Sequence, residues 1–138
     1  MSQGSCRPES VLFGAREMTT DPQPQTPLLT LSLYRRGDWS VLEAAGEMDT
    51  QSVVRLRTML LAAGSTAVLD LRQVSFMDAS GLGVLATCGH RARRLGGVVR
   101  LVGPTRQIRQ LLALTRLDQV LPVFESMEEA LAPTAPSS

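Results

Sequence analysis

The chain has 138 residues, enough for one compact domain with tails and too few for two full domains, and 43% apolar residues can supply a core. Its 14 basic and 13 acidic residues leave a net charge of +1, so no bulk charge draws the protein to nucleic acid or to an anionic membrane. Every basic residue is an arginine, which excludes a P-loop lysine, a Schiff-base enzyme and an aspartate-phosphorylated receiver domain.

Residues 1–27 are rich in Ser, Thr, Gln and Pro, which predicts a flexible N-terminal arm. Residues 132–138 have the same composition and are expected to form a flexible tail. The folded domain is therefore predicted to span residues 28–131. No apolar run approaches the ~20 residues of a membrane span, and the N-terminus lacks a signal peptide, so a soluble cytoplasmic protein is expected.

The first elements of the domain read as a β-hairpin followed by a helix. Leucines alternate with polar residues over residues 29–33, which predicts a strand; residues 35–38 predict a turn and residues 39–44 the antiparallel return strand. Asp49 or Thr50 can cap the helix, and Gly64 stops it. The apolar positions of this helix are Val53, Leu56, Leu60 and Ala63.

A buried strand at residues 67–71, a loop at 72–78 and a second helix beginning near residues 79–81 are predicted next. Residues 98–102 form the following strand, Thr105 precedes a third helix, and residues 120–124 form a short strand. Residues 126–129 are a capping box that opens the last helix. The residues expected on the buried sides of the second and third helices are Leu82, Leu85, Leu95, Ile108, Leu111, Leu112 and Thr115.

The order of these elements predicts an α/β fold. The crossovers imply a mixed, mainly parallel sheet with an N-terminal antiparallel β-hairpin and about four helices packed against it.

Few side chains are suited to catalysis or metal binding. Cys6 and Cys88 are too few for a disulfide framework or a structural zinc site, and His90 is the one histidine. We expect Cys88 to fill the core and His90 to lie on a helix surface. No metal, no cofactor and no enzymatic activity are therefore predicted.

The loop and helix start at residues 74–83 lie where open α/β sheets usually place their sites. A nucleophile elbow would need glycine two residues before and after Ser80, but Asp78 and Leu82 stand there. A dinucleotide fingerprint matches only weakly, because Ala86 replaces its third glycine and the loop is not the first βα turn of the domain.

What remains is the Ser80 hydroxyl beside Asp78 at a helix N-terminus. Either residue can simply cap the helix, a contribution of about 0.5–2 kcal/mol. The functional alternative is a phosphoacceptor, because free amide groups and the helix dipole there can receive a phosphate.

The stretch Phe76-Met77-Asp78-Ala79-Ser80-Gly81-Leu82-Gly83 closely resembles the signature of bacterial anti-sigma factor antagonists, the small single-domain members of the STAS family. Gly46-Glu47-Met48-Asp49 resembles a second family motif, and Gly96-Gly97 before a strand fits as well. The resemblance covers roughly residues 28–131. Ala79 replaces a hydroxyl residue that is usual in the family, but the residue that the family phosphorylates is present as Ser80.

The resemblance implies a partner-switching function. Family members bind an anti-sigma factor that is also a serine kinase with a bound adenine nucleotide, and this binding frees a sigma factor for RNA polymerase. The kinase stops the process by phosphorylating the serine, here Ser80, and a metal-dependent serine phosphatase restores it. The implied partners are thus this kinase and this phosphatase, with no direct contact to nucleic acid or membrane.

The docking surface is expected to surround Ser80. The residues assigned to it are Glu47, Asp49, Ser75, Met77, Asp78, Ala79 and Leu82. Three of these have structural alternatives: Asp49 can cap the first helix, Met77 can belong to the core, and Glu47 can be an ordinary solvated residue. The arginines Arg91, Arg93 and Arg94 are interpreted as a solvated helix end rather than a nucleic-acid patch.

Two other kinds of function fit parts of the sequence. One is a STAS scaffold without a switch, in a stress-signalling assembly or as a subunit of a lipid-transport complex. The other is an α/β enzyme or nucleotide-binding domain with its site at the Gly81 and Gly83 loop, against which the lack of lysine and of paired histidines argues.

Overall fold

A β-hairpin opens the part of the chain that the computed structural model describes, residues 29–133. Strand β3 (Thr30–Arg36) pairs antiparallel with strand β4 (Trp39–Met48), and Gly37 turns the chain between them with a φ of +61°. The predicted hairpin is confirmed, although β4 runs on to Met48. The arm predicted for residues 1–27 lies outside the described residues, as do residues 134–138 of the predicted tail.

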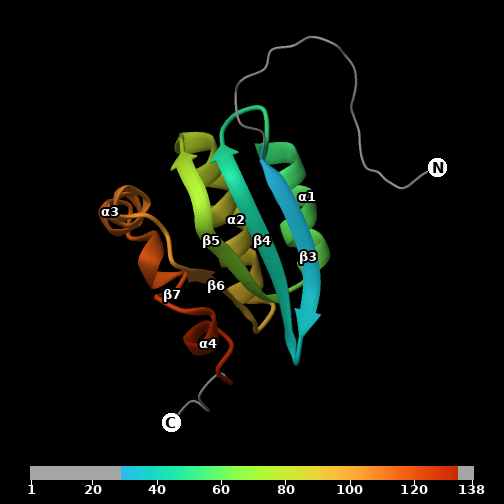
Figure 1. Ribbon diagram of the computed structural model, residues 1–138. Coiled ribbons are helices and arrows are strands. Elements are labelled where there is room, and N and C mark those ends of the chain that lie inside the picture. Colours follow the sequence, from blue (N-terminus) through green and yellow to red (C-terminus); the bar gives the residue numbers. More distant parts are fainter. Residues whose placement is uncertain (1–28, 134–138) are drawn as a thin grey trace, which may run out of the picture.

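Three further strands join β4 in parallel, in the spatial order β3-β4-β5-β6-β7 (Figure 1). This arrangement confirms the predicted fold class, a mixed and mainly parallel sheet that begins with an antiparallel hairpin. The remaining elements, in chain order, are α1 (Val53–Ala63), β5 (Thr66–Met77), α2 (Ala79–Arg94), β6 (Val98–Val102), α3 (Arg106–Leu114), the 3-10 helix η1 (Leu117–Gln119), β7 (Val123–Phe124) and α4 (Met127–Ala130).

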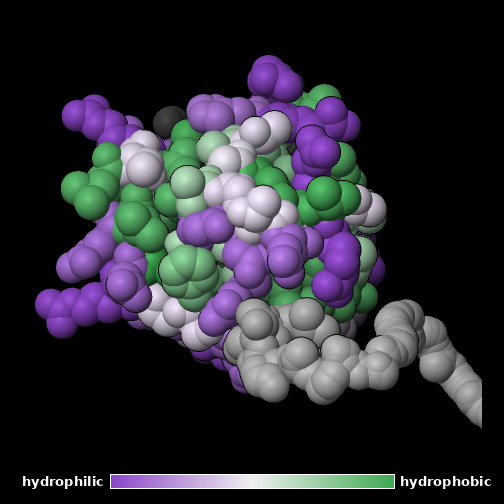
Figure 2. Space-filling view, turned by 90° about the horizontal axis from the view of Figure 1, so that it is seen from above, coloured by the Kyte–Doolittle hydropathy of each residue, from purple (hydrophilic) through white to green (hydrophobic). Residues whose placement is uncertain are grey.

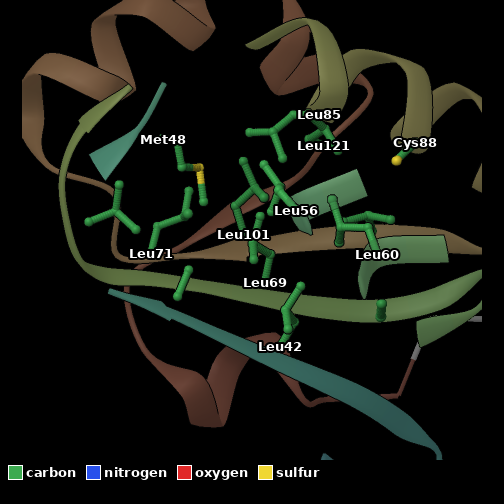
Figure 3. Close-up of a cluster of buried hydrophobic side chains, with 14 of the residues drawn as sticks. Leu42, Met48, Leu56, Leu60, Leu69, Leu71, Leu85, Cys88, Leu101 and Leu121 are labelled. Atoms are coloured by element: carbon green, nitrogen blue, oxygen red, sulfur yellow. The ribbon is translucent and has the colours of Figure 1, made fainter. Parts of the chain in front are cut away.

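The main core lies between the sheet and helices α1 and α2, which run behind it in Figure 1. Leu42, Leu69 and Leu101 stand side by side on the three central strands and are fully buried. Figure 3 shows these leucines pointing toward Leu56 and Leu60 of α1 and Leu85 of α2. The predicted stripe of α1 is confirmed, because Leu56, Leu60 and Ala63 are its buried residues. Cys88 belongs to the same core and His90 is exposed, as predicted.

The opposite face of the sheet carries a smaller cluster under α4, here called the Arg100 cluster. It comprises Trp39, Val41, Val68, Arg100, Val102, Phe124 and Ala130. The Arg100 guanidinium carbon lies 4.5 Å from the Trp39 ring centroid and 5.1 Å from that of Phe124. Its Nη1 donates to the carbonyl oxygens of Ala130 (2.9 Å) and Ala132 (2.7 Å), so one buried cation fastens the end of α4 to the sheet.

The predicted loop at residues 72–78 is wrong, because β5 continues as a strand to Met77. The pairing of β4 with β5 shifts between Glu43 and Ala45 and again between Gly46 and Glu47, and β5 takes one extra residue at each shift. Buried side chains of β5 therefore recur at every third position (Leu71, Val74, Met77) instead of every second. For this reason the sequence of β5 does not show the alternation of apolar and polar residues that is typical of a strand.

Some helix and strand boundaries also differ from the prediction. The N-cap position of α1 is Ser52 rather than Asp49 or Thr50, because Asp49 and Thr50 lie in the turn before it. Leu95 is 60% exposed at the C-cap of α2, where the helix ends and its side chain leaves the core face. Residues 120–122 are not strand, because η1 occupies the chain just before them and β7 pairs with β6 only at two residues. Thr115, expected on the buried side of α3, is its exposed C-cap.

The last two helices begin as the sequence predicts. The Thr105 hydroxyl accepts a hydrogen bond from the N–H of Ile108, and the Ser126 hydroxyl accepts one from the N–H of Glu129. These are side-chain N-caps, each of which satisfies an amide that the helix itself leaves free.

Candidate functional site

The carboxyl ends of β4 and β5 form a two-stranded projection of the sheet. β5 pairs with β6 only as far as Asp70, but with β4 as far as Met77. The connections β4–α1 and β5–α2 therefore meet at one edge, at the top of Figure 1. A hydrogen bond from the Asp78 N–H to the Met48 carbonyl oxygen (3.1 Å) ties the two connections together.

Asp78 is the N-cap of α2, and Ser80 lies in the first turn of that helix. One carboxylate oxygen of Asp78, Oδ1, accepts from the N–H of Ser80 (2.9 Å) and from the N–H of Gly81 (3.1 Å). The same oxygen accepts from the Ser80 hydroxyl at 2.5 Å. The capping role therefore belongs to Asp78, and the Ser80 hydroxyl is a donor that takes no part in capping.

These contacts correct one detail of the sequence analysis. Free amide groups were expected at this helix start to receive a phosphate, but two of them, those of Ser80 and Gly81, are already bonded to Asp78. The Asp78 pKa is lowered, first of all by the hydrogen bond from the Ser80 hydroxyl, while desolvation by burial works in the opposite direction. Backbone N–H groups of Gly81, Ser80 and Thr50 lower it further. Asp78 is thus held as a carboxylate.

The two glycines of the Ser-Gly-Leu-Gly stretch serve different purposes. A Cβ on Gly81 would lie 2.9 Å from Cγ of Met77 and 3.2 Å from Cβ of Met48, so only glycine lets α2 approach the strand ends this closely. A Cβ on Gly83 would meet nothing within 4 Å. Gly81 is needed by the fold, whereas Gly83 is exposed and leaves the surface of α2 near Ser80 without a side chain.

The structure brings six of the seven predicted docking residues to the surface of this edge. Ser75 and Ala79 are exposed, and Glu47, Asp49, Asp78 and Leu82 are half-buried. Met77 is 3% exposed and belongs to the core, which is the structural alternative given for it. Asp49 is not the N-cap of α1, but its Oδ1 accepts from the N–H groups of Gln51 (3.0 Å) and Ser52 (3.2 Å) in the turn before that helix, and its side chain is half-buried.

An apolar surface next to this edge was not predicted. Phe76 is 46% exposed and Leu114 is 81% exposed, and both line a hollow of about 180 Å³ between the end of β5 and α3. Figure 2, which looks down on the edge, shows hydrophobic surface gathered on the side of α3. This surface could not be predicted, because the sequence predicts a loop at residues 72–78 and the contact with α3 depends on the tertiary fold.

A second hollow, of about 690 Å³, lies away from Ser80 on the open face of the sheet over β3, β4 and β5. Its charged groups are paired among themselves or with neighbours: Arg72 donates two hydrogen bonds to Asp70, and Tyr34 donates one to Glu43. Within residues 29–133, no three His, Cys, Asp or Glu side chains gather as metal ligands would. In the same described range, no helix is long and apolar enough to cross a bilayer.

Known proteins are similar to this chain both in sequence and in fold. The chain is 31% identical over 102 residues to the anti-sigma-F factor antagonist RsfA of Mycobacterium tuberculosis, an alignment of 74% of this chain and 77% of that protein. A solved anti-sigma factor antagonist from Mycobacterium paratuberculosis superposes with a TM-score of 0.68 at 25% identity, over 75% of this chain and 92% of the other. The Bacillus cell fate determinant SpoIIAA, solved in its phosphorylated form, has the same fold, with a TM-score of 0.59 at 23% identity over 75% and 96% of the two chains.

The family model for the STAS domain matches residues 30–130, which include every strand and helix described above. The chain belongs to the STAS domain family, and its similar relatives are anti-sigma factor antagonists.

Proposed function

We propose that this protein is an anti-sigma factor antagonist whose activity is switched at Ser80. In this function the unphosphorylated domain binds an anti-sigma factor that is also a serine kinase, and the bound kinase releases its sigma factor. Phosphorylation of Ser80 ends the binding, and a serine phosphatase reverses it. The domain acts as a binding module in the cytoplasm and is not itself an enzyme.

The observation that carries this proposal is the position of the Ser80 hydroxyl. It lies at the projecting edge of the sheet, half-buried, and its hydrogen bond goes to Asp78, only two residues away. Esterification of this oxygen breaks no contact with the core, so the fold can survive the modification. The domain can therefore exist in two states that differ mainly in charge.

The surface around Ser80 supports a docking role. Ala79 and Gly83 leave the exposed side of the first turns of α2 free of long side chains, and Phe76 and Leu114 add apolar area between the end of β5 and α3. An exposed apolar patch of this kind next to a flat surface is typical of protein interaction sites. The relative RsfA, an anti-sigma-F factor antagonist, supports an anti-sigma factor as the partner.

Charge explains how the switch would act. A phosphate adds about −1.5 to −2 charges at neutral pH, and removing it from water at an interface costs several kcal/mol unless it is paired. A penalty of about 3–4 kcal/mol lowers affinity several-hundred-fold, because each 1.4 kcal/mol is about a factor of ten.

The proposal is tested by incubating the protein with candidate anti-sigma kinases and ATP and mapping the modified residue by mass spectrometry. Ser80→Ala should abolish labelling, whereas Ser32→Ala should leave it intact, because Ser32 is an exposed serine on β3 that lines the hollow away from Ser80 and lies outside the docking surface. Ser80→Asp should weaken binding to the kinase by a factor of about 10 or more, with phosphoserine weakening it several-hundred-fold. Labelling that persists in Ser80→Ala, or full affinity of the phosphorylated protein, would contradict the proposal.

A further inference from the structure

The hydrogen bond between Ser80 and Asp78 can exist only before phosphorylation. The Asp78 carboxylate is an acceptor without a proton, so the 2.5 Å contact needs the proton of the Ser80 hydroxyl. A phosphoserine ester oxygen has no proton to donate. After modification the same two oxygen atoms would therefore face each other as acceptors, beside a phosphate that carries up to two negative charges.

We propose that Asp78 is a positioning residue of the Ser80 switch: it orients the hydroxyl before phosphoryl transfer and repels the phosphate afterwards. This inference rests on the proposed function of Ser80 and adds a second task to the helix-capping role of Asp78. The two tasks use the same carboxylate oxygen, Oδ1, which also holds the amides of Ser80 and Gly81.

Orientation follows from the donor geometry. With its proton directed at Asp78 Oδ1, the Ser80 oxygen is restricted to one side-chain rotamer, and its lone pairs are left for the incoming phosphorus. In the transfer, a bond forms between Ser80 Oγ and the γ-phosphorus of the kinase's nucleoside triphosphate. The bond from that phosphorus to the β–γ bridging oxygen breaks, the nucleoside diphosphate leaves, and the hydroxyl proton is released to solvent. Phosphoryl transfer depends mainly on positioning of this kind.

Repulsion follows from the occupied helix cap. A phosphate at a helix N-terminus is usually stabilised by free amides, but Asp78 already takes those of Ser80 and Gly81. Two of the three amides in the first turn of α2 are thus occupied, and the Asp78 carboxylate beside them repels a second negative charge, so we expect the phosphate to turn away from the cap, toward solvent and the docking surface. The domain thus presents the new charge to its partner rather than neutralising it.

Other charges near this edge are accounted for in the test. Glu47 lies at the end of β4 and Asp49 on the β4–α1 connection, which is tied to the start of α2 by the bond from the Asp78 N–H to the Met48 carbonyl. Asp49 does not bond to Ser80; its Oδ1 accepts from the amides of Gln51 and Ser52. Asp49→Asn is therefore a matched control that removes one negative charge from the same edge without touching the acceptor.

The experiment installs phosphoserine at position 80 by genetic encoding, so it needs no kinase. The second pKa of the phosphate is measured by ³¹P NMR titration in the otherwise native protein, in Asp78→Asn and in Asp49→Asn. A neighbouring carboxylate disfavours the dianion and so raises this pKa; Asp78→Asn should lower it by about half a unit or more, because two like charges about 5 Å apart repel by that amount even in water. Asp49→Asn should shift it by less than half as much.

The orienting role is read from the unphosphorylated protein. Three-bond couplings of the Ser80 β-protons should report a single rotamer in the native domain and averaged rotamers in Asp78→Ser. Serine is chosen because it also caps helices well, so the domain stays folded while the carboxylate is lost. Circular dichroism of each variant checks this.

Equal phosphate pKa values in the native and Asp78→Asn proteins, or equal shifts in both variants, would overturn the repulsion. Unchanged couplings in Asp78→Ser would overturn the orientation. Neither result depends on whether a kinase labels Ser80, which mass spectrometry decides separately, so a failure of this inference and a failure of the proposed function are distinguishable.

Discussion

The molecule holds polar groups in two contrasting ways, at the Ser80 edge and in the Arg100 cluster. The contacts of the Ser80 side chain are local, because its hydroxyl bonds to a residue two positions away at a half-exposed edge. The contacts of Arg100 span the fold: it lies between two aromatic rings and bonds to carbonyl groups 30 and 32 residues further along the chain. The proposed addition of charge at Ser80 would break no contact with the core, whereas removal of the charge of Arg100 would.

In this small domain, the residues proposed for function and the residues that stabilise the fold therefore lie in different regions. A group with only local contacts can be modified with a small change in the free energy of unfolding, because few other contacts are lost. A buried cation that joins α4 to the sheet contributes to stability through every partner it satisfies.

The largest effect is expected from Arg100→Met, which keeps an apolar stem but removes the cation. Two hydrogen bonds and two ring contacts disappear and the buried carbonyl of Ala130 loses its partner, so we expect a loss of about 2–4 kcal/mol in the free energy of unfolding. Trp39 is the single tryptophan of the chain, so its fluorescence also reports loosening of α4. Arg94→Met, at an exposed site in the last turn of α2, should cost less than about 1 kcal/mol.

Urea denaturation followed by Trp39 emission measures both variants. If Arg100→Met were as stable as Arg94→Met, Arg100 would not stabilise the packing of α4 on the sheet. The difference drawn here between the Arg100 cluster and the edge around Ser80 would then be wrong.

A medium effect is expected from Gly81 and Gly83, two glycines near the start of α2 that are two positions apart. Gly81→Ala places a methyl group 2.9 Å from Met77 and 3.2 Å from Met48, so the helix or the methionines must shift at a cost of about 1–2 kcal/mol. Gly83→Ala has open space and a better helix former, so it should stabilise by up to about 1 kcal/mol. Thermal unfolding of the two variants should therefore change in opposite directions, and equal changes would contradict the roles given to these glycines.

The smallest effect concerns the pH dependence at the Ser80 edge. The Asp78 pKa is lowered in the folded state, so this group stabilises the fold above its unfolded pKa of about 3.9, and the stabilisation is lost as the pH falls through the folded pKa. Ser80→Ala removes the first cause of the lowering, so the Asp78 pKa should rise toward its ordinary value and the loss should begin at higher pH. Carboxyl ¹³C NMR titration measures this, with Ser75→Ala as the control that should leave Asp78 unchanged.

Much of the fold could be predicted from the sequence because local signals agreed with the tertiary structure. Alternating leucines in β3, the apolar stripe of α1 and the caps Thr105 and Ser126 all appear where they were expected. The end of β5 could not be predicted, because its two extra residues follow from pairing with β4 and change the spacing of buried side chains. Register of this kind is a property of two strands together, which no single segment reveals.

The site divides in the same way. The motif around Ser80 is contiguous in sequence, so its residues could be named in advance. The division of roles within it could not be predicted, because Asp78 and Ser80 were equally suitable as caps until the hydrogen bonds were known. The apolar surface formed by Phe76 and Leu114 joins a strand to a helix more than 30 residues away, and only the folded chain brings the two together.

The short reach of the Ser80 hydrogen bond has a consequence for regulation. If Ser80 is phosphorylated as we propose, the phosphate changes little beyond its own surroundings, so its effect depends on the protein that binds this edge. A partner with an acidic or apolar complement would be turned away by the added phosphate, while one with an arginine pocket would be recruited by it. Phosphorylation of the same serine could then weaken the binding of one partner and strengthen the binding of another, with no other change in the domain.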